Sequence, residues 1–263
     1  MNANAISLVP NHSCGWRMGL GNMLAKELSS WWRTRRWWVQ CLLWLFFMNG
    51  SMAANLANGQ ASEDAILNFL WVAGAVLPIG VIILGQDSIL GERHCGTAAW
   101  VFSKPLRRLA FILAKLIAYG LGFLAVAVVL PGLLGYFQIT VIGRLEVPVA
   151  GFAGAMGLVF LNLLFYLTLT LMLATLFHGR GPVLGITLFL VWFWMLPDPS
   201  VWLADFMPWR LLIALGHTGA VPSLASYVVQ GLPLPTTAPI IATVLGCVVF
   251  VAVAVWRTAR EEF

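Results

Sequence analysis

The sequence predicts an all-α integral membrane protein with six transmembrane helices. Of its 263 residues, 60% are hydrophobic and only 10% are charged, whereas about 25% of the residues in a soluble domain are charged. Several apolar runs reach about 20 residues, the length that a helix needs to cross a hydrocarbon core of about 30 Å. These runs are continuously apolar and do not alternate with polar residues, which favours helices over a membrane β-barrel.

The apolar runs give the order of the expected elements along the chain. The six predicted spans cover residues 38–58, 67–86, 109–132, 149–177, 182–198 and 236–256. They form a single transmembrane domain over 38–256, preceded by a segment of residues 1–37 and followed by a tail of residues 257–263. The first residues lack an apolar core after a basic start, so we expect no cleavable signal peptide.

The segment before the first span is predicted to form an amphipathic helix in the membrane interface. Leucines recur at helical spacing on one face, at Leu20, Leu24 and Leu28, while Lys26 and Arg33 share another face. The tryptophans fit an aromatic belt at the level of the lipid headgroups, with arginines beside them to meet anionic lipid. They are Trp31, Trp32, Trp37 and Trp38.

The basic residues predict the orientation of the bundle. With six spans, thirteen of the fifteen Lys and Arg residues fall on one side, and only Arg144 and Arg210 fall on the other. Because cytoplasmic loops carry an excess of Lys and Arg, both termini are expected in the cytoplasm, in a bacterial-type cytoplasmic (inner) membrane. The net charge of +5 is thereby explained by topology, and no nucleic-acid partner is expected.

The longest outer segment covers residues 199–235, between the fifth and sixth spans. It is amphipathic and is interrupted by prolines at 208, 222, 233 and 235. Such a segment is too broken to cross the membrane, so we expect short helices that dip into the outer interface.

Polar residues inside the spans form two stripes at helical spacing. The six residues are Ser51, Asn55 and Asn58 in the first span, and Asn162, Tyr166 and Thr170 in the fourth. Because an unpaired amide is costly in lipid, the stripes must face protein or a wet cavity. They are candidates either for hydrogen bonds between helices or for the lining of a substrate pathway. No Asp or Glu lies in the middle of a span, which argues against an ion-coupled carrier.

The sequence offers no candidate for catalysis in this chain. The four cysteines are scattered without a C-x-x-C pair. His12 lies near Cys14 and His94 adjoins Cys95, but a metal site needs three or four convergent ligands, so none is predicted. Hydrolase motifs and a phosphate-binding G-x-x-x-x-G-K-[ST] loop are also absent. We therefore expect a non-catalytic chain without a cofactor; if ATP drives it, ATP and Mg bind to a partner.

Charged residues are concentrated in the stretch 87–115, which is expected to connect the second and third spans in the cytoplasm. Apolar residues such as Trp100 lie between the charges, and Pro105 separates two elements. The motif residues follow in the order Glu92, Gly96, Thr97, Ser103, Pro105, Arg108 and Lys115. This order resembles the cytoplasmic connection after the second helix in the membrane subunits of type-2 ABC transporters. The Lys26-Glu27-Leu28 segment is similar to the helix that precedes the first span in that family.

The resemblance implies the permease subunit of an ATP-driven exporter that works by alternating access. Two copies of a cytoplasmic ABC ATPase would dock on a coupling region at 87–108, and the permease would form a homodimer or a heterodimer with a related chain. Glu92 and Arg108 would pair with charges on the ATPase, Gly96 would permit a tight bend, and Pro105 would end a helix before the third span. The residues implied in coupling are Glu92, Arg93, Gly96, Thr97, Pro105, Arg108 and Lys115. The alternatives are an ion-coupled carrier or channel and a membrane scaffold that transports nothing.

Overall fold

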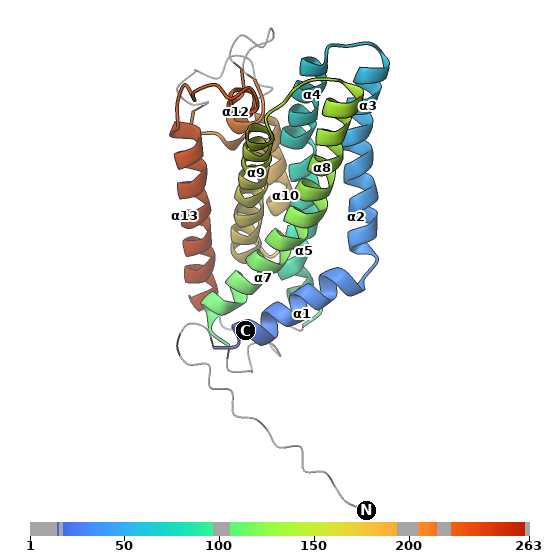
Figure 1. The fold of residues 1–263 in the computed structure, drawn as a ribbon. Coiled ribbons are helices and arrows are strands. Elements are labelled where there is room, and N and C mark those ends of the chain that lie inside the picture. The colour runs from blue at the N-terminus through green and yellow to red at the C-terminus, as the bar shows by residue number, and fades with distance from the viewer. Residues whose placement is uncertain (1–14, 16–17, 97–105, 194–204, 215–221, 261–263) are drawn as a thin grey trace, which may run out of the picture.

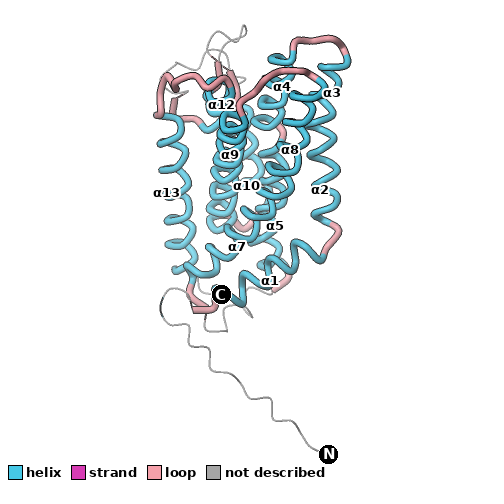
Figure 2. Tube along the Cα trace, viewed as in Figure 1, coloured by secondary structure: helices cyan, strands magenta, loops and turns pink. Residues whose placement is uncertain are grey.

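The fold is a bundle of long helices in a computed structural model of the chain. The structure describes residues 15, 18–96, 106–193, 205–214 and 222–260. Every regular element within these ranges is helical, as Figure 2 shows. The predicted all-α class is therefore confirmed for the described part of the chain.

Long apolar helices dominate the bundle. Among the described residues, five continuous helical stretches are long and apolar enough to cross a membrane: Trp37–Ala57, Ser62–His94, Arg108–Ile142, Val149–Leu176 and Ala238–Arg260. They contain most of the first, second, third, fourth and sixth predicted spans. The fifth predicted span, 182–198, begins as the apolar helix α10 (Arg180–Trp192), which is shorter than the other five. Residues 194–204 lie outside the described residues, so the count of six stays a prediction.

The first three of these stretches are assembled from shorter segments. In chain order they are α2 (Arg36–Trp44), η2 (Leu45–Asn49) and α3 (Gly50–Ala57); α4 (Ser62–Ala75) and α5 (Leu77–His94); α7 (Arg108–Phe123), η3 (Leu124–Val129), α8 (Leu130–Phe137) and η4 (Gln138–Ile142). Pro78 lies in the first turn of α5, where its missing N–H is tolerated. The segments η2, η3 and η4 are π-helical, and such turns widen a helix locally.

Helix α9 (Val149–Leu176) forms the centre of the bundle, and α5, α7, α10, α12 and α13 pack around it (Figure 1). Its Tyr166 is among the largest side chains with no exposed surface. Helix α13 (Ala238–Arg260) lies at the periphery and leaves many of its apolar side chains exposed, among them Leu245 and Val248. Exposed apolar faces of this kind are expected where a helix borders lipid.

The loop within the charged stretch 87–115 is shorter than the composition of the stretch predicts. Residues 87–94 continue α5 to His94, and α7 already begins at Arg108. The connection proper is therefore limited to 95–107, and 97–105 lie outside the described residues. The helices extend past the apolar runs because their charged side chains find partners at this end of the bundle, as described below.

The described residues between α10 and α13 form two short helices, in a segment where prolines predict broken structure. They are η6 (Pro208–Leu211) and α12 (Leu224–Val229), at the end of the bundle opposite α1 (Figure 1). Arg210 is buried there and its Nη1 donates a hydrogen bond to the carbonyl oxygen of Pro222 at 2.6 Å. Burial lowers the pKa of the Arg210 guanidinium, and the charge of Asp205 opposes this shift.

Candidate functional site

Helix α1 (Leu20–Arg33) lies across one end of the bundle and packs against α7 (Figure 1). Its side chains Met23, Glu27 and Trp31 follow at intervals of four residues, so they share one face, and all three are buried. The indole of Trp31 lies directly on Gly122 of α7, where any Cβ atom would overlap the ring. This close contact makes α1 part of the packed bundle.

A cluster of four charges, three of them largely buried, joins α1 to α5 and α7. We call Lys26, Glu27, Glu92 and Lys115 the charge cluster. Lys115 Nζ lies 3.1 Å from Glu27 Oε1 and 3.2 Å from Glu92 Oε2. The same ammonium group donates a hydrogen bond to the carbonyl oxygen of Ser88 at 2.6 Å. Because a buried ammonium ion is stable only when it is paired and hydrogen-bonded, these contacts account for a lysine inside the bundle.

The two lysines of the charge cluster differ in their environment. The side chain of Lys115 is 1% exposed, whereas that of Lys26 is 48% exposed. Lys26 Nζ pairs with Glu92 Oε1 at 2.6 Å, so Glu92 bridges both lysines. Water and salt screen the outer pair more than the inner one, so loss of one partner should cost more at the contact between Lys115 and Glu27 than at the contact of Lys26.

The adjacent residue, Arg93, connects the same end of α5 to the central helix. Its Nη1 donates to the carbonyl oxygens of Ala174 at 2.7 Å and Phe177 at 3.2 Å, and its Nη2 donates to that of Thr175 at 3.2 Å. The last carbonyl groups of a helix have no partner within the helix and carry partial negative charge. A guanidinium placed there satisfies the C-terminal end of α9.

Nearly two turns earlier in α5, Asp87 Oδ1 lies 3.0 Å from Arg180 Nη2 of α10. The side chain of Arg180 is 56% exposed and that of Asp87 is 39% exposed, so water screens this pair and it adds little stability. Together, Asp87, Glu92 and Arg93 connect the end of α5 to α1, α7, α9 and α10.

The structure describes five of the seven residues that are predicted to act in coupling. Glu92, Arg93 and Lys115 have partners within the chain. Gly96 follows α5 with a φ of 67°, a left-handed conformation that favours glycine. Arg108 is the first residue of α7 and is half-buried. Thr97 and Pro105 lie outside the described residues. Contact of these residues with an ATPase stays a prediction.

Two members of the charge cluster, Lys26 and Glu27, were not predicted as site residues from the sequence. A signal was present: Glu27 falls on the buried side of an amphipathic helix, where a carboxylate requires a partner. The partner Lys115 is 88 residues away along the chain, so its position depends on the fold.

The polar stripe of the first span has a modest structural role in the chain. Ser51 Oγ donates a hydrogen bond to the carbonyl oxygen of Met48 at 2.9 Å, Asn55 is half-buried, and Asn58 is exposed after the end of α3. A function in lining a pathway stays a prediction for these three residues.

The stripe on α9 is inside the core. Asn162, Tyr166 and Thr170 have no exposed surface, and Thr170 Oγ1 donates to the carbonyl oxygen of Tyr166 at 2.6 Å. Within the described part of the chain, the side-chain amide of Asn162 and the hydroxyl of Tyr166 have no hydrogen-bond partner. The sequence analysis did not single out two further buried amide residues, Asn49 and Gln138. Gln138 Nε2 donates a hydrogen bond to the backbone carbonyl oxygen of Asn49 at 3.4 Å.

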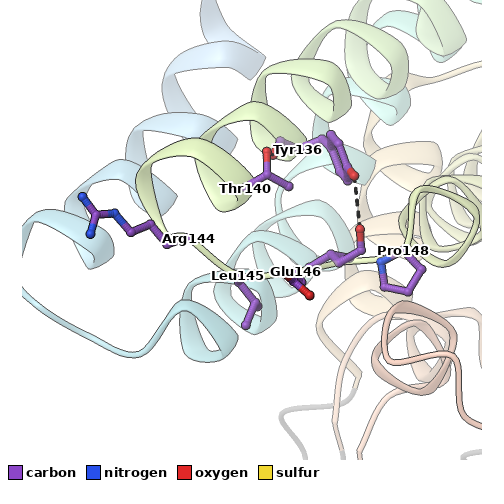
Figure 3. Close-up of a pocket in the computed structure, with 7 residues that line it drawn as sticks. Tyr136, Thr140, Arg144, Leu145, Glu146 and Pro148 are labelled. Atoms are coloured by element: carbon purple, nitrogen blue, oxygen red, sulfur yellow. Dashed lines mark hydrogen bonds between the residues drawn. The ribbon is translucent and has the colours of Figure 1, made fainter.

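Hollows at the opposite end of the bundle contain none of the predicted residues. One has a volume of about 680 Å³ and is lined by η4 and the segment after it; Figure 3 shows Tyr136 bonded to the backbone there and Arg144 directed away from it. The bond runs from Tyr136 Oη to the carbonyl oxygen of Val147 at 3.1 Å. A smaller hollow of about 240 Å³ includes Glu63, Asp64 and Glu146. No group of three His, Cys, Asp or Glu side chains that could hold a metal occurs among the described residues.

The fold defines an all-helical protein whose several long apolar helices are the architecture of a multi-pass membrane protein. At one end of the bundle, charged side chains of α1, α5 and α7 pair with one another. The chain belongs to the DUF2705 family, described as a protein of unknown function, which matches residues 35–263. The match begins after α1, so Lys26 and Glu27 lie outside it. No curated protein matches the chain.

Proposed function

We propose that the chain is the permease subunit of an ATP-driven exporter similar to the type-2 ABC transporters. Both termini lie in the cytoplasm of a bacterial-type cytoplasmic membrane. Two permease chains, identical or related, form the pathway, and two separate ATPase subunits bind ATP and Mg. This chain performs no chemistry of its own.

The observation that carries the proposal is the attachment of the coupling region to the bundle. A domain that transmits force requires a firm contact between the element that is pushed and the helices that move. The end of α5 meets this requirement: Glu92 contacts α1 and α7 through the charge cluster, and Arg93 contacts the end of α9. A displacement of residues 95–107 would therefore pass to three helices at once.

The mechanism follows from this attachment. Closure of the two ATPases on nucleotide moves both coupling regions, and α5 tilts together with α1, α7 and α9. A change in the tilt of two symmetry-related bundles opens a central pathway to one side of the membrane and closes it to the other.

The test requires a residue that can contact an ATPase without stabilising the permease. Glu92 is unsuitable, because reversing its charge would disrupt the charge cluster itself. Arg107 is exposed and lies directly before α7. We expect the tagged wild-type chain, purified from its native membrane in mild detergent, to co-purify with an ATPase. Arg107→Glu should lose most of that ATPase, whereas Arg260→Glu, at the same end of the bundle, should retain it.

Three results would overturn the proposal. If no ATPase co-purifies with the wild-type chain, the proposed ATP-hydrolysing partner is absent. Transport that persists in ATP-depleted vesicles would indicate an ion-coupled carrier or channel. A stable complex whose ATP turnover moves no substrate would indicate a scaffold.

A further inference from the structure

Aromatic and basic side chains gather at the corner where α1 ends and α2 begins. We call Trp32, Arg33, Arg35, Trp37 and Trp38 the corner patch. The indoles contact one another, with ring centroids 5.8 Å apart for Trp32 and Trp37 and 4.5 Å apart for Trp37 and Trp38. Trp32 is 43% exposed and Trp38 is 57% exposed. The corner patch thus offers indole surface and positive charge side by side.

The arginines of the corner patch differ from other basic residues of the chain. Lys26, Lys115 and Arg93 have partners inside the bundle. Arg33 and Arg35 are exposed, and neither forms a salt bridge or a side-chain hydrogen bond with any residue in the described ranges. Two guanidinium groups are therefore available to an external anion.

The surroundings of the corner patch place that anion at the membrane surface. Directly beyond it, Val39 and Leu42 of α2 and Phe46 of η2 are 56%, 65% and 72% exposed, as expected for a helical stretch that enters hydrocarbon. On the other side, α1 turns polar residues such as Lys26 and Ser29 outward. Indoles prefer the level of the lipid headgroups, so Arg33 and Arg35 lie at the depth of the lipid phosphates.

We propose that the corner patch binds the headgroup of an anionic phospholipid of the phosphatidylglycerol type. The guanidinium groups pair with the phosphate, since their planar donors match phosphate oxygens, and the indoles cover the glycerol and upper acyl region. The net positive charge of the patch selects an anionic lipid over a zwitterionic one, whose choline group would be repelled. This inference does not depend on an ATPase partner.

Native mass spectrometry of the full chain in detergent tests the proposal, with dioleoylphosphatidylglycerol and dioleoylphosphatidylcholine as separate probes. Each basic residue near an anionic surface contributes about fivefold in affinity. The double variant Arg33→Gln/Arg35→Gln should therefore bind phosphatidylglycerol roughly 25-fold more weakly. The double variant Arg33→Lys/Arg35→Lys keeps both charges but loses the planar donors, so its affinity for phosphatidylglycerol should fall between those of the wild type and the double Gln variant.

A matched control removes a charge from the same end of the bundle but away from the corner patch. Arg257 lies in the last turn of α13, and Arg257→Gln should change the affinity for phosphatidylglycerol less than twofold. Equal binding of the two lipids by the wild type would overturn the proposal, as would an unchanged affinity in the double Gln variant. A loss in Arg257→Gln as large as in the double Gln variant would overturn it too, because binding would then follow total charge.

Discussion

Replacing Lys115 with methionine should severely destabilise the protein. The substitution keeps most of the length of the side chain but removes the charge that pairs with Glu27 at 3.1 Å and Glu92 at 3.2 Å. Glu92 keeps its contact with Lys26, whereas Glu27, which is 7% exposed, retains only a distant contact with Lys26 at 3.8 Å. Removing one partner of a buried ion pair typically costs about 3–5 kcal/mol, because the other charge stays buried without compensation.

That free energy corresponds to a large change in thermal stability. For a chain of this size, 1 kcal/mol shifts Tm by about 2–4 °C, so Lys115→Met should lower Tm by roughly 10 °C. The measurement is thermal unfolding of the detergent-solubilised chain, followed by intrinsic tryptophan fluorescence. The indole of Trp31 adjoins the site and should report the loosening of α1.

Two further variants test the reasoning behind this value. Lys26→Met removes the lysine that is 48% exposed and should cost less than about 1 kcal/mol. The double variant Lys115→Met/Glu27→Gln should recover part of the loss, because no unpaired charge then stays buried. The reasoning is refuted if Lys115→Met unfolds within about 2 °C of the wild type, or if Lys26→Met is equally destabilising.

Other predictions concern packing and buried polar groups. Gly122→Ala should destabilise the chain by about 1–3 kcal/mol, because the new methyl group overlaps the indole of Trp31. As a control in the same unfolding assay, Gly157→Ala should be neutral or stabilising, because its Cβ meets nothing within 4 Å. Asn162→Leu should leave stability unchanged or raise it, because its amide is buried without a partner; a loss above 2 kcal/mol would reveal a hydrogen bond, for example to water. Arg93→Met should increase hydrogen exchange at the end of α9, and unchanged exchange there would contradict its role as a cap.

The positions of the long helices were predictable because they depend on local composition. A run of apolar residues is helical in lipid whichever neighbours it meets, since its backbone groups must be satisfied within the segment. For this reason the fourth predicted span, 149–177, agrees with α9 (Val149–Leu176) to within one residue. The ends of the second span were predicted less well, because α5 continues to His94 through charged residues that composition alone assigns to a loop.

The role of the charged residues could not be predicted from their spacing. Glu92 and Lys115 were assigned to coupling with another protein, which stays a prediction, and their spacing did not predict the partners that both have inside the chain. The contacts of Lys115 with Glu27 and of Arg93 with the end of α9 join residues more than 80 positions apart. Such pairs depend on where and at what angle two helices cross, and the hydropathy of each helix does not predict either.

The amino-acid sequence by itself determined that this chain forms long apolar helices, and it located most of them, because hydrophobic runs and backbone hydrogen bonding act within a segment. Only the tertiary structure decided which charges are paired. It buried Lys115 between two carboxylates while leaving Arg33 and Arg35 exposed at the corner patch. The physical reason is that the energy of a charge depends on its distance from other charges and from water, and the packing of separate helices sets both.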